Sequence, residues 1–109
     1  MNIEIENYLN KYPKEIKELF IEIRKIIYEA SKDVDERLWA KIPSYYLDES
    51  FVRMIPFKDH INIEAKAIIE YKEKLGGYKI TPKGMLQIYI NEKMPSQILF
   101  DAIKKTLIK

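Results

Sequence analysis

The sequence predicts an α+β fold, because two different periods of apolar residues occur along one chain of 109 residues. Near both ends, apolar residues recur at steps of three and four, which is typical of helices with one buried face. In the middle, they alternate with polar residues at a period of two, which is typical of strands packed on one side. We therefore expect one antiparallel sheet of about five strands, with the N- and C-terminal helices packed on one face.

Helices are predicted at both ends of the chain. A short helix is expected over residues 3–11, and a longer one starts at Pro13, where the missing N–H costs nothing. The longer helix has a single apolar face. That face consists of Ile16, Leu19, Phe20, Ile23, Ile27 and Ala30. Pro95 opens the last helix, whose inner face begins with Ile98 and Leu99.

Strands fill most of the middle of the chain. They are expected around residues 38–42, 45–47, 51–57, 60–64 and 86–90. Between the last two, residues 65–75 are predicted to be helical. Gly76 and Gly77 would close that helix in the left-handed backbone conformation. No repeat or linker divides the chain, so a single domain over 1–109 is expected.

Composition argues against several classes of protein. The 19 basic and 17 acidic residues give a net charge of +2, which does not indicate a nucleic-acid partner. There is no cysteine, which excludes disulfides and thiolate metal sites. No apolar run suggests a membrane span or a signal peptide, so a cytoplasmic location is expected. With a single histidine and no phosphate-binding glycine loop, we do not expect an enzyme.

Three segments, taken in order, carry a family resemblance. Trp39 and Pro43 occupy an aromatic and a proline position, and Lys41 stands where glycine is usual. Residues 57–61 read Phe-Lys-Asp-His-Ile, close to a family pattern of Phe-Lys-Lys-His-Ile. Residues 78–95 resemble the family's turn, strand and start of a proline-led helix. Together these segments resemble the YdhG-like family of frataxin-like iron chaperones.

That resemblance implies a compact sheet covered by helices and a weak, transferable site for ferrous iron. The partners it implies are proteins of iron–sulfur cluster assembly or haem synthesis. Ferrous iron accepts carboxylate and imidazole ligands. The candidate metal ligands are Asp33, Asp35 and Glu36, together with His60, the only histidine. The alternative is that these are ordinary solvated acids at element ends and an exposed strand histidine.

A second hypothesis is a small-ligand-binding module that uses the sheet face without helices. Strand alternation puts His60 on the face opposite Ile61, and the same rule puts Trp39 and Lys41 opposite Leu38. The candidate ligand-binding residues are Trp39, Lys41, Arg53, Lys58, His60 and Tyr89. An aromatic floor with convergent cations suits a planar or anionic small molecule.

Two further interpretations of the same residues stay open. Trp39 and Tyr89 could simply stack on neighbours across the strands and stabilise the sheet. The chain could also act purely through protein contacts, as a monomer or a weak homodimer.

Overall fold

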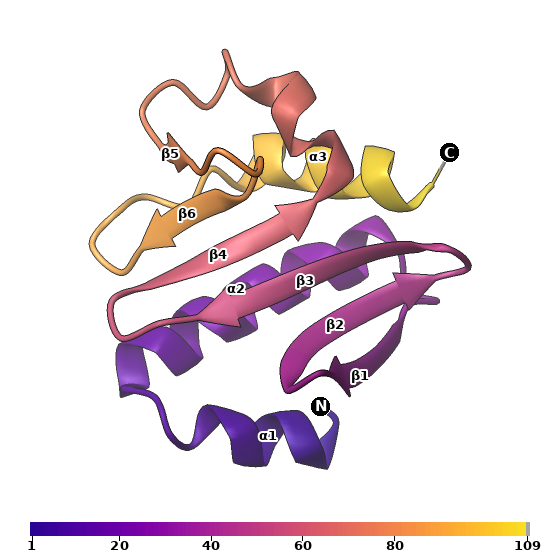
Figure 1. The fold of residues 1–109 in the computed structure, drawn as a ribbon, viewed down its shortest axis with the longest axis vertical. Helices are drawn as coiled ribbons and strands as arrows, with labels where there is room; N and C mark the ends of the chain where they lie inside the picture. The colour runs from indigo at the N-terminus through magenta and orange to yellow at the C-terminus, as the bar shows by residue number, and fades with distance from the viewer. Residues whose placement is uncertain (109) are drawn as a thin grey trace.

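A computed structural model describes residues 1–108 as one open antiparallel sheet with helices at both ends of the chain (Figure 1). The elements are α1 (Ile3–Leu9), α2 (Lys14–Ala30), β1 (Asp35–Trp39), β2 (Ile42–Leu47), β3 (Ser50–Pro56), β4 (His60–Ala65), the 3-10 helix η1 (Lys66–Tyr71), β5 (Lys79–Ile80), β6 (Leu86–Tyr89) and α3 (Ser96–Leu107). The six strands follow the order β1-β2-β3-β4-β6-β5. The predicted fold class is confirmed, with a sixth strand in addition to the expected five or so.

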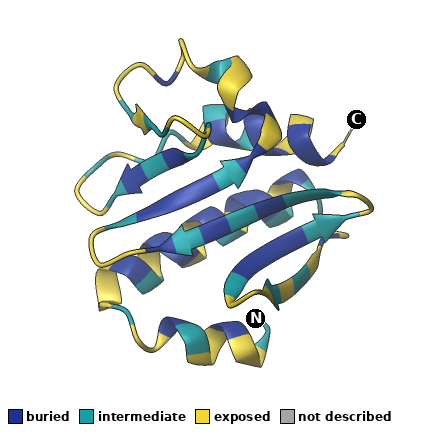
Figure 2. Cartoon of the chain, viewed as in Figure 1, coloured by how far each residue is buried: buried dark blue, intermediate teal, exposed yellow. Residues whose placement is uncertain are grey.

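The helices α2 and α3 lie behind the sheet and bury one of its faces (Figure 1). Buried residues concentrate in the central strands and along these two helices, whereas the edge strands β1 and β5 are mainly exposed (Figure 2). From the sheet, the core takes Val52, Met54, Ile61, Ile63, Leu86 and Ile88. Burying a side chain of this size contributes about 1.5–3 kcal/mol. Neither α2 nor α3 covers the opposite face, which we call the open face (Figure 1).

The predicted strand around 38–42 is interrupted by a hairpin turn. Trp39 pairs directly with Ile42 across β1 and β2, and the two residues between them form the turn. Ala40 and Lys41 have φ values of 49° and 66°, as a type I′ turn requires. Such turns normally carry asparagine or glycine, so Ala40 and Lys41 are not a recognisable turn pair. The expected placement of Lys41 beside Trp39 on one strand face is therefore wrong.

The segment after β4 also differs from the prediction. Instead of an α-helix over 65–75, a 3-10 helix covers Lys66–Tyr71 and turns follow it. Neither Gly76 nor Gly77 has a positive φ, so they do not close a helix in the left-handed conformation. Gly84 does have a positive φ, of 90°, in the turn between β5 and β6. None of the helices within residues 1–108 has the length and hydrophobicity that a membrane-spanning segment requires.

Candidate functional site

The open face carries a row of polar side chains across four strands. In the pairing register, Arg37 lies opposite Ser44, Ser44 opposite Arg53, and Arg53 opposite Glu64. Residues two positions further along each strand share this face, because side chains alternate along a strand. The row therefore brings two arginines and a glutamate together with the aromatic residues beside them.

Arg53 lies at the centre of what we call the Arg53 cluster. Its members are Trp39, Ser44, Tyr46, Phe51, Arg53 and Glu64. The guanidinium carbon lies 4.1 Å from the centroid of the Trp39 ring and 3.8 Å from that of Phe51. Ser44, which lies between them on β2, is small and fully buried, so the arginine can reach across β2 to β1. Each such cation–π contact is worth about 0.5–2 kcal/mol.

The polar contacts of Arg53 fix its orientation. Its Nε donates to Ser44 Oγ and its Nη2 donates to the Tyr46 hydroxyl, both at 3.2 Å. Its Nη1 lies 3.6 Å from Glu64 Oε1. The Arg53 side chain is only 12% exposed, whereas that of Glu64 is 37% exposed. Arg53 is thus held in place by contacts inside the protein, and Glu64 keeps acceptor capacity for a group outside it.

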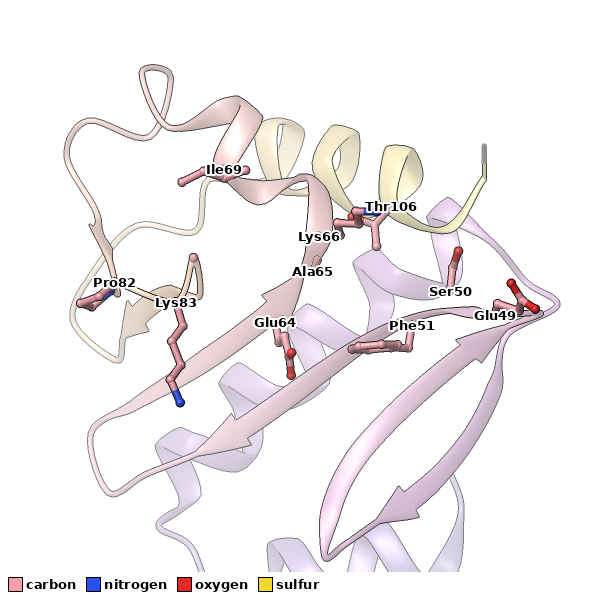
Figure 3. A pocket seen from close by; sticks show the side chains of 11 residues that line it. Glu49, Ser50, Phe51, Glu64, Ala65, Lys66, Ile69, Pro82, Lys83 and Thr106 are labelled. Atoms are coloured by element: carbon pink, nitrogen blue, oxygen red, sulfur yellow. The ribbon is translucent and has the colours of Figure 1, made fainter.

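A cleft of about 530 Å³ lies beside the Arg53 cluster (Figure 3). Phe51 and Glu64 belong to both the cluster and the lining of the cleft. Ile69 of η1 supplies an apolar wall and is 52% exposed. Lys83 closes another side, from the turn before β6. The volume lies within the range of small-molecule sites, which runs from about 300 to 1,000 Å³.

The turn that carries Lys83 is tied to itself by three hydrogen bonds. Thr81 N–H donates to the carbonyl of Met85 at 2.8 Å, and Gly84 N–H donates to the carbonyl of Thr81 at 2.9 Å. Met85 N–H donates to Thr81 Oγ1 at 3.1 Å. The positive φ of Gly84 suits a residue without a Cβ. The backbone under Lys83 is therefore held in place before any ligand arrives.

His60 forms a separate aromatic stack further along the open face. Its ring lies 4.5 Å from that of Phe57 and 4.6 Å from that of Tyr89, with small interplanar angles of 8° and 26°. Its Nδ1 lies 2.8 Å from Asp59 Oδ1. The sequence prediction that His60 lies on the face opposite Ile61 holds, since Ile61 is fully buried in the core. His60 therefore packs between two aromatic rings on the sheet.

Glu36, one of the predicted metal ligands, accepts several hydrogen bonds on the helix-covered side of the sheet. Arg24 donates to it through Nε at 2.5 Å and through Nη2 at 3.2 Å. Tyr45 donates its hydroxyl at 2.8 Å, and Asn2 donates its N–H at 2.9 Å. Burial would raise the pKa of Glu36, but these hydrogen bonds outweigh it, so the pKa lies below its ordinary value.

The other predicted metal ligands lie apart from Glu36. Asp35 precedes it on β1 and pairs with Arg37 at 3.3 Å, and Asp33 is exposed in the turn before β1. His60 lies on β4, and β2 and β3 separate it from β1. Within residues 1–108, no group of three or more histidine, aspartate or glutamate side chains is placed to hold a metal ion.

The predicted ligand-binding residues fall into three places. Trp39 and Arg53 meet in the Arg53 cluster, whereas His60 and Tyr89 stack with each other. The two remaining residues are lysines in turns between strands. They are Lys41, between β1 and β2, and Lys58, between β3 and β4.

Sequence reasoning missed part of the site. Phe51 lies two residues from Arg53 on β3, so strand alternation alone could have assigned it to the site. Strand alternation places Glu64 on the same face as His60, but only the strand pairing shows that it lies opposite Arg53. Lys83 follows a proline in a turn, and no pattern in the sequence points it toward β4.

Comparison with known proteins identifies the family. A family described as a domain of unknown function (DUF5655) matches residues 5–105. No curated protein and no solved structure matches the chain. The expected YdhG-like, frataxin-like resemblance is therefore wrong: its motifs are a hairpin, a strand and a proline-led helix, which many α+β chains share. The chain belongs to the DUF5655 family.

Proposed function

We propose that this domain is a small-molecule-binding module and not an enzyme, and that its ligand carries a ring that enters the cleft beside the Arg53 cluster. One observation carries this proposal. Phe51 and Glu64 line the cleft and both contact Arg53, a side chain that is only 12% exposed. A largely buried arginine that is held by two hydrogen bonds, an ion pair and two aromatic rings is an orienting group. It therefore holds an apolar and an acidic part of the lining in fixed positions.

Fixed lining favours binding because less side-chain freedom is lost when a ligand arrives. The hydrogen bonds of Thr81 likewise fix the turn that carries Lys83, so little backbone freedom is lost there on binding. Exposed apolar surface supplies the driving force: Ile69 is 52% exposed and Phe51 presents an aromatic ring. Covering such surface contributes about 25 cal/mol per Å². A single-ring molecule fits both the volume and the mixture of apolar and polar lining.

Iron donation stays a prediction without support from this site. It came from a resemblance that the family match replaces. Its proposed acids do not converge, because Glu36 is hydrogen-bonded on the core side of the sheet and Asp33 lies in the turn before β1. We therefore rest the proposed function on the cleft.

An NMR titration with ¹⁵N-labelled protein tests the binding function. The probes are phenol, benzoate and benzylamine, which share a ring and differ in charge. We expect at least one probe to shift the amide signals of Phe51, Ile69 and Lys83 in a saturable manner. The Trp39 indole signal should follow, because Arg53 contacts both its ring and that of Phe51.

A matched pair of variants distinguishes binding in the cleft from non-specific binding to exposed apolar residues. Ile69→Asn places an amide on the wall of the cleft and should weaken binding severalfold. Ile21→Asn makes the same change on α2 at a residue with almost the same exposure, 53% against 52%. It should leave the titration unchanged. Equal effects of the two substitutions, or no saturable shift with any of the probes, would disprove the proposal.

A further inference from the structure

Two side chains of opposite charge line the cleft without neutralising each other. Lys83 extends from its turn across the open face toward β4, from which Glu64 projects (Figure 3). The amine of Lys83 forms no ion pair with any part of the chain that the structure describes. Over the same residues, the one ion pair of Glu64 is its 3.6 Å contact with Arg53.

The surroundings explain why Lys83 and Glu64 stay apart. The hydrogen bonds of Thr81 fix the backbone that carries Lys83. Glu64 is turned toward Arg53 on the neighbouring strand. The ammonium group therefore keeps its donors, and the carboxylate keeps most of its acceptor sites. Both groups face a cleft that is large enough for a small molecule.

The other two charged residues of the lining are also one acid and one base. Glu49 and Lys66 also line the cleft, so its two lysines and two glutamates have a formal charge that sums to zero. A ligand with a single charge would approach one group of opposite sign and one of like sign. A ligand that carries both charges complements the whole lining, and like-charge repulsion acts against its competitors.

We infer that the cleft selects a zwitterion of the α-amino-acid type with an apolar ring as its side chain. Its carboxylate would meet Lys83, its ammonium group would meet Glu64, and its ring would lie against Phe51 and Ile69. The inference rests on the proposed binding function and adds the chemical class of the ligand. It needs no chemical step, because binding and release alone are required.

Three ligands with the same ring separate this inference from the function it rests on. L-phenylalanine carries both charges, 3-phenylpropionate only the carboxylate, and phenethylamine only the ammonium group. Dissociation constants come from the NMR shifts of the Ile69 amide. We expect L-phenylalanine to bind roughly three- to fivefold more tightly than either single-charge ligand, as for a partly exposed ion pair.

Neutral substitutions should then weaken binding in a ligand-specific way. Lys83→Gln should weaken L-phenylalanine and 3-phenylpropionate but not phenethylamine. Glu64→Gln keeps an oxygen for Arg53 and should weaken L-phenylalanine and phenethylamine but not 3-phenylpropionate. Lys25→Gln on the exposed side of α2 is the control and should change none of the three constants.

The possible failures differ. If a single-charge ligand binds as tightly as L-phenylalanine, or if either substitution weakens all three ligands equally, the zwitterion inference is overturned and the binding function stands. If none of the three ligands binds while the cleft amides do respond to phenol, the class of ligand is wrong and the site is right. If the cleft responds to no probe, both proposals fall together.

Discussion

Two arginine–glutamate pairs lie on opposite faces of the same sheet and differ in almost every contact. On the helix-covered face, Arg24 and Glu36 are joined by two hydrogen bonds, and the Glu36 side chain is only 7% exposed. On the open face, Arg53 and Glu64 approach only to 3.6 Å, and the Glu64 side chain is 37% exposed. In the first pair the carboxylate is the enclosed group, and in the second pair it is the arginine.

The difference separates a structural pair from one that is free to act. Glu36 accepts hydrogen bonds from Arg24, Tyr45 and the N–H of Asn2, and so ties α1, α2, β1 and β2 together. Its acceptor sites are in use, which leaves little for a ligand. Within residues 1–108, Glu64 has one long ion pair, and it faces the cleft. A carboxylate in a ligand site needs this spare capacity.

Removing the arginine from each pair gives the largest expected difference. Arg24→Met leaves Glu36 in the protein interior without its cation, and we expect a loss of about 3 kcal/mol in the free energy of unfolding. Arg53→Met removes ring contacts and two hydrogen bonds but leaves Glu64 solvated, so about 1 kcal/mol should be lost.

Urea unfolding at neutral pH, followed by far-UV circular dichroism, measures both losses. Arg53→Met should also change the emission of Trp39, the single tryptophan, whereas Arg24→Met should change it little while the protein is folded. A larger loss from Arg53→Met than from Arg24→Met would contradict the distinction between the two pairs.

Acid should act on the covered pair in a predictable direction. The pKa of Glu36 is lower in the folded protein than its ordinary value, because Arg24, Asn2 and Tyr45 hydrogen-bond the charged form despite its burial. Its contribution is therefore complete above the unfolded pKa of about 4.3 and is lost as the pH falls through the folded pKa. Below that pH, the group no longer favours the folded state.

Glu36→Gln isolates this contribution. We expect the variant to be less stable than the wild type at pH 7 and the gap to narrow steadily in urea titrations below about pH 5. Asp35→Asn is the neighbouring control, since the Asp35 side chain is 65% exposed and its pair with Arg37 is worth little. A gap that stays constant down to the acid limit would show that Glu36 does not titrate as an ion-paired carboxylate.

The sequence predicted features that depend on neighbouring residues better than contacts between residues far apart in the chain. The apolar face of α2 and the alternation of Ile61 and Ile63 are local patterns, and both packed as expected. The pairing of Arg24 with Glu36 joins residues on different elements, and no period predicts it.

The site was less predictable than the core for the same reason. Alternation put Trp39 and Arg53 on one face, but their contact also requires the small Ser44 between them. The position of Lys83 depends on how the turn before β6 folds back over the sheet. The alternation of side chains predicts on which face of a strand a residue lies. Which residues of different strands meet at a site also depends on strand order and turn geometry.

Substitutions in the hairpin between β1 and β2 should have the smallest effects on stability. The hairpin is connected with both pairs, because β1 carries Glu36 and also Trp39, which contacts Arg53. This hairpin holds Glu36 toward the core and Trp39 toward the open face. Lys41 has a φ of 66°, a left-handed conformation that strains a residue with a Cβ. Lys41→Gly should therefore raise the free energy of unfolding by about 0.5–1 kcal/mol, despite the greater freedom of glycine in the unfolded chain.

Gly84→Ala provides the opposite case, because Gly84 also has a positive φ, and the added Cβ should lower stability by about 1 kcal/mol. Urea unfolding of the two variants beside the wild type checks the signs. If Lys41→Gly lowers stability instead, the turn residues do not hold the left-handed conformation in solution. The turn would then not fix the pairing register between β1 and β2 that sets Trp39 opposite Ile42.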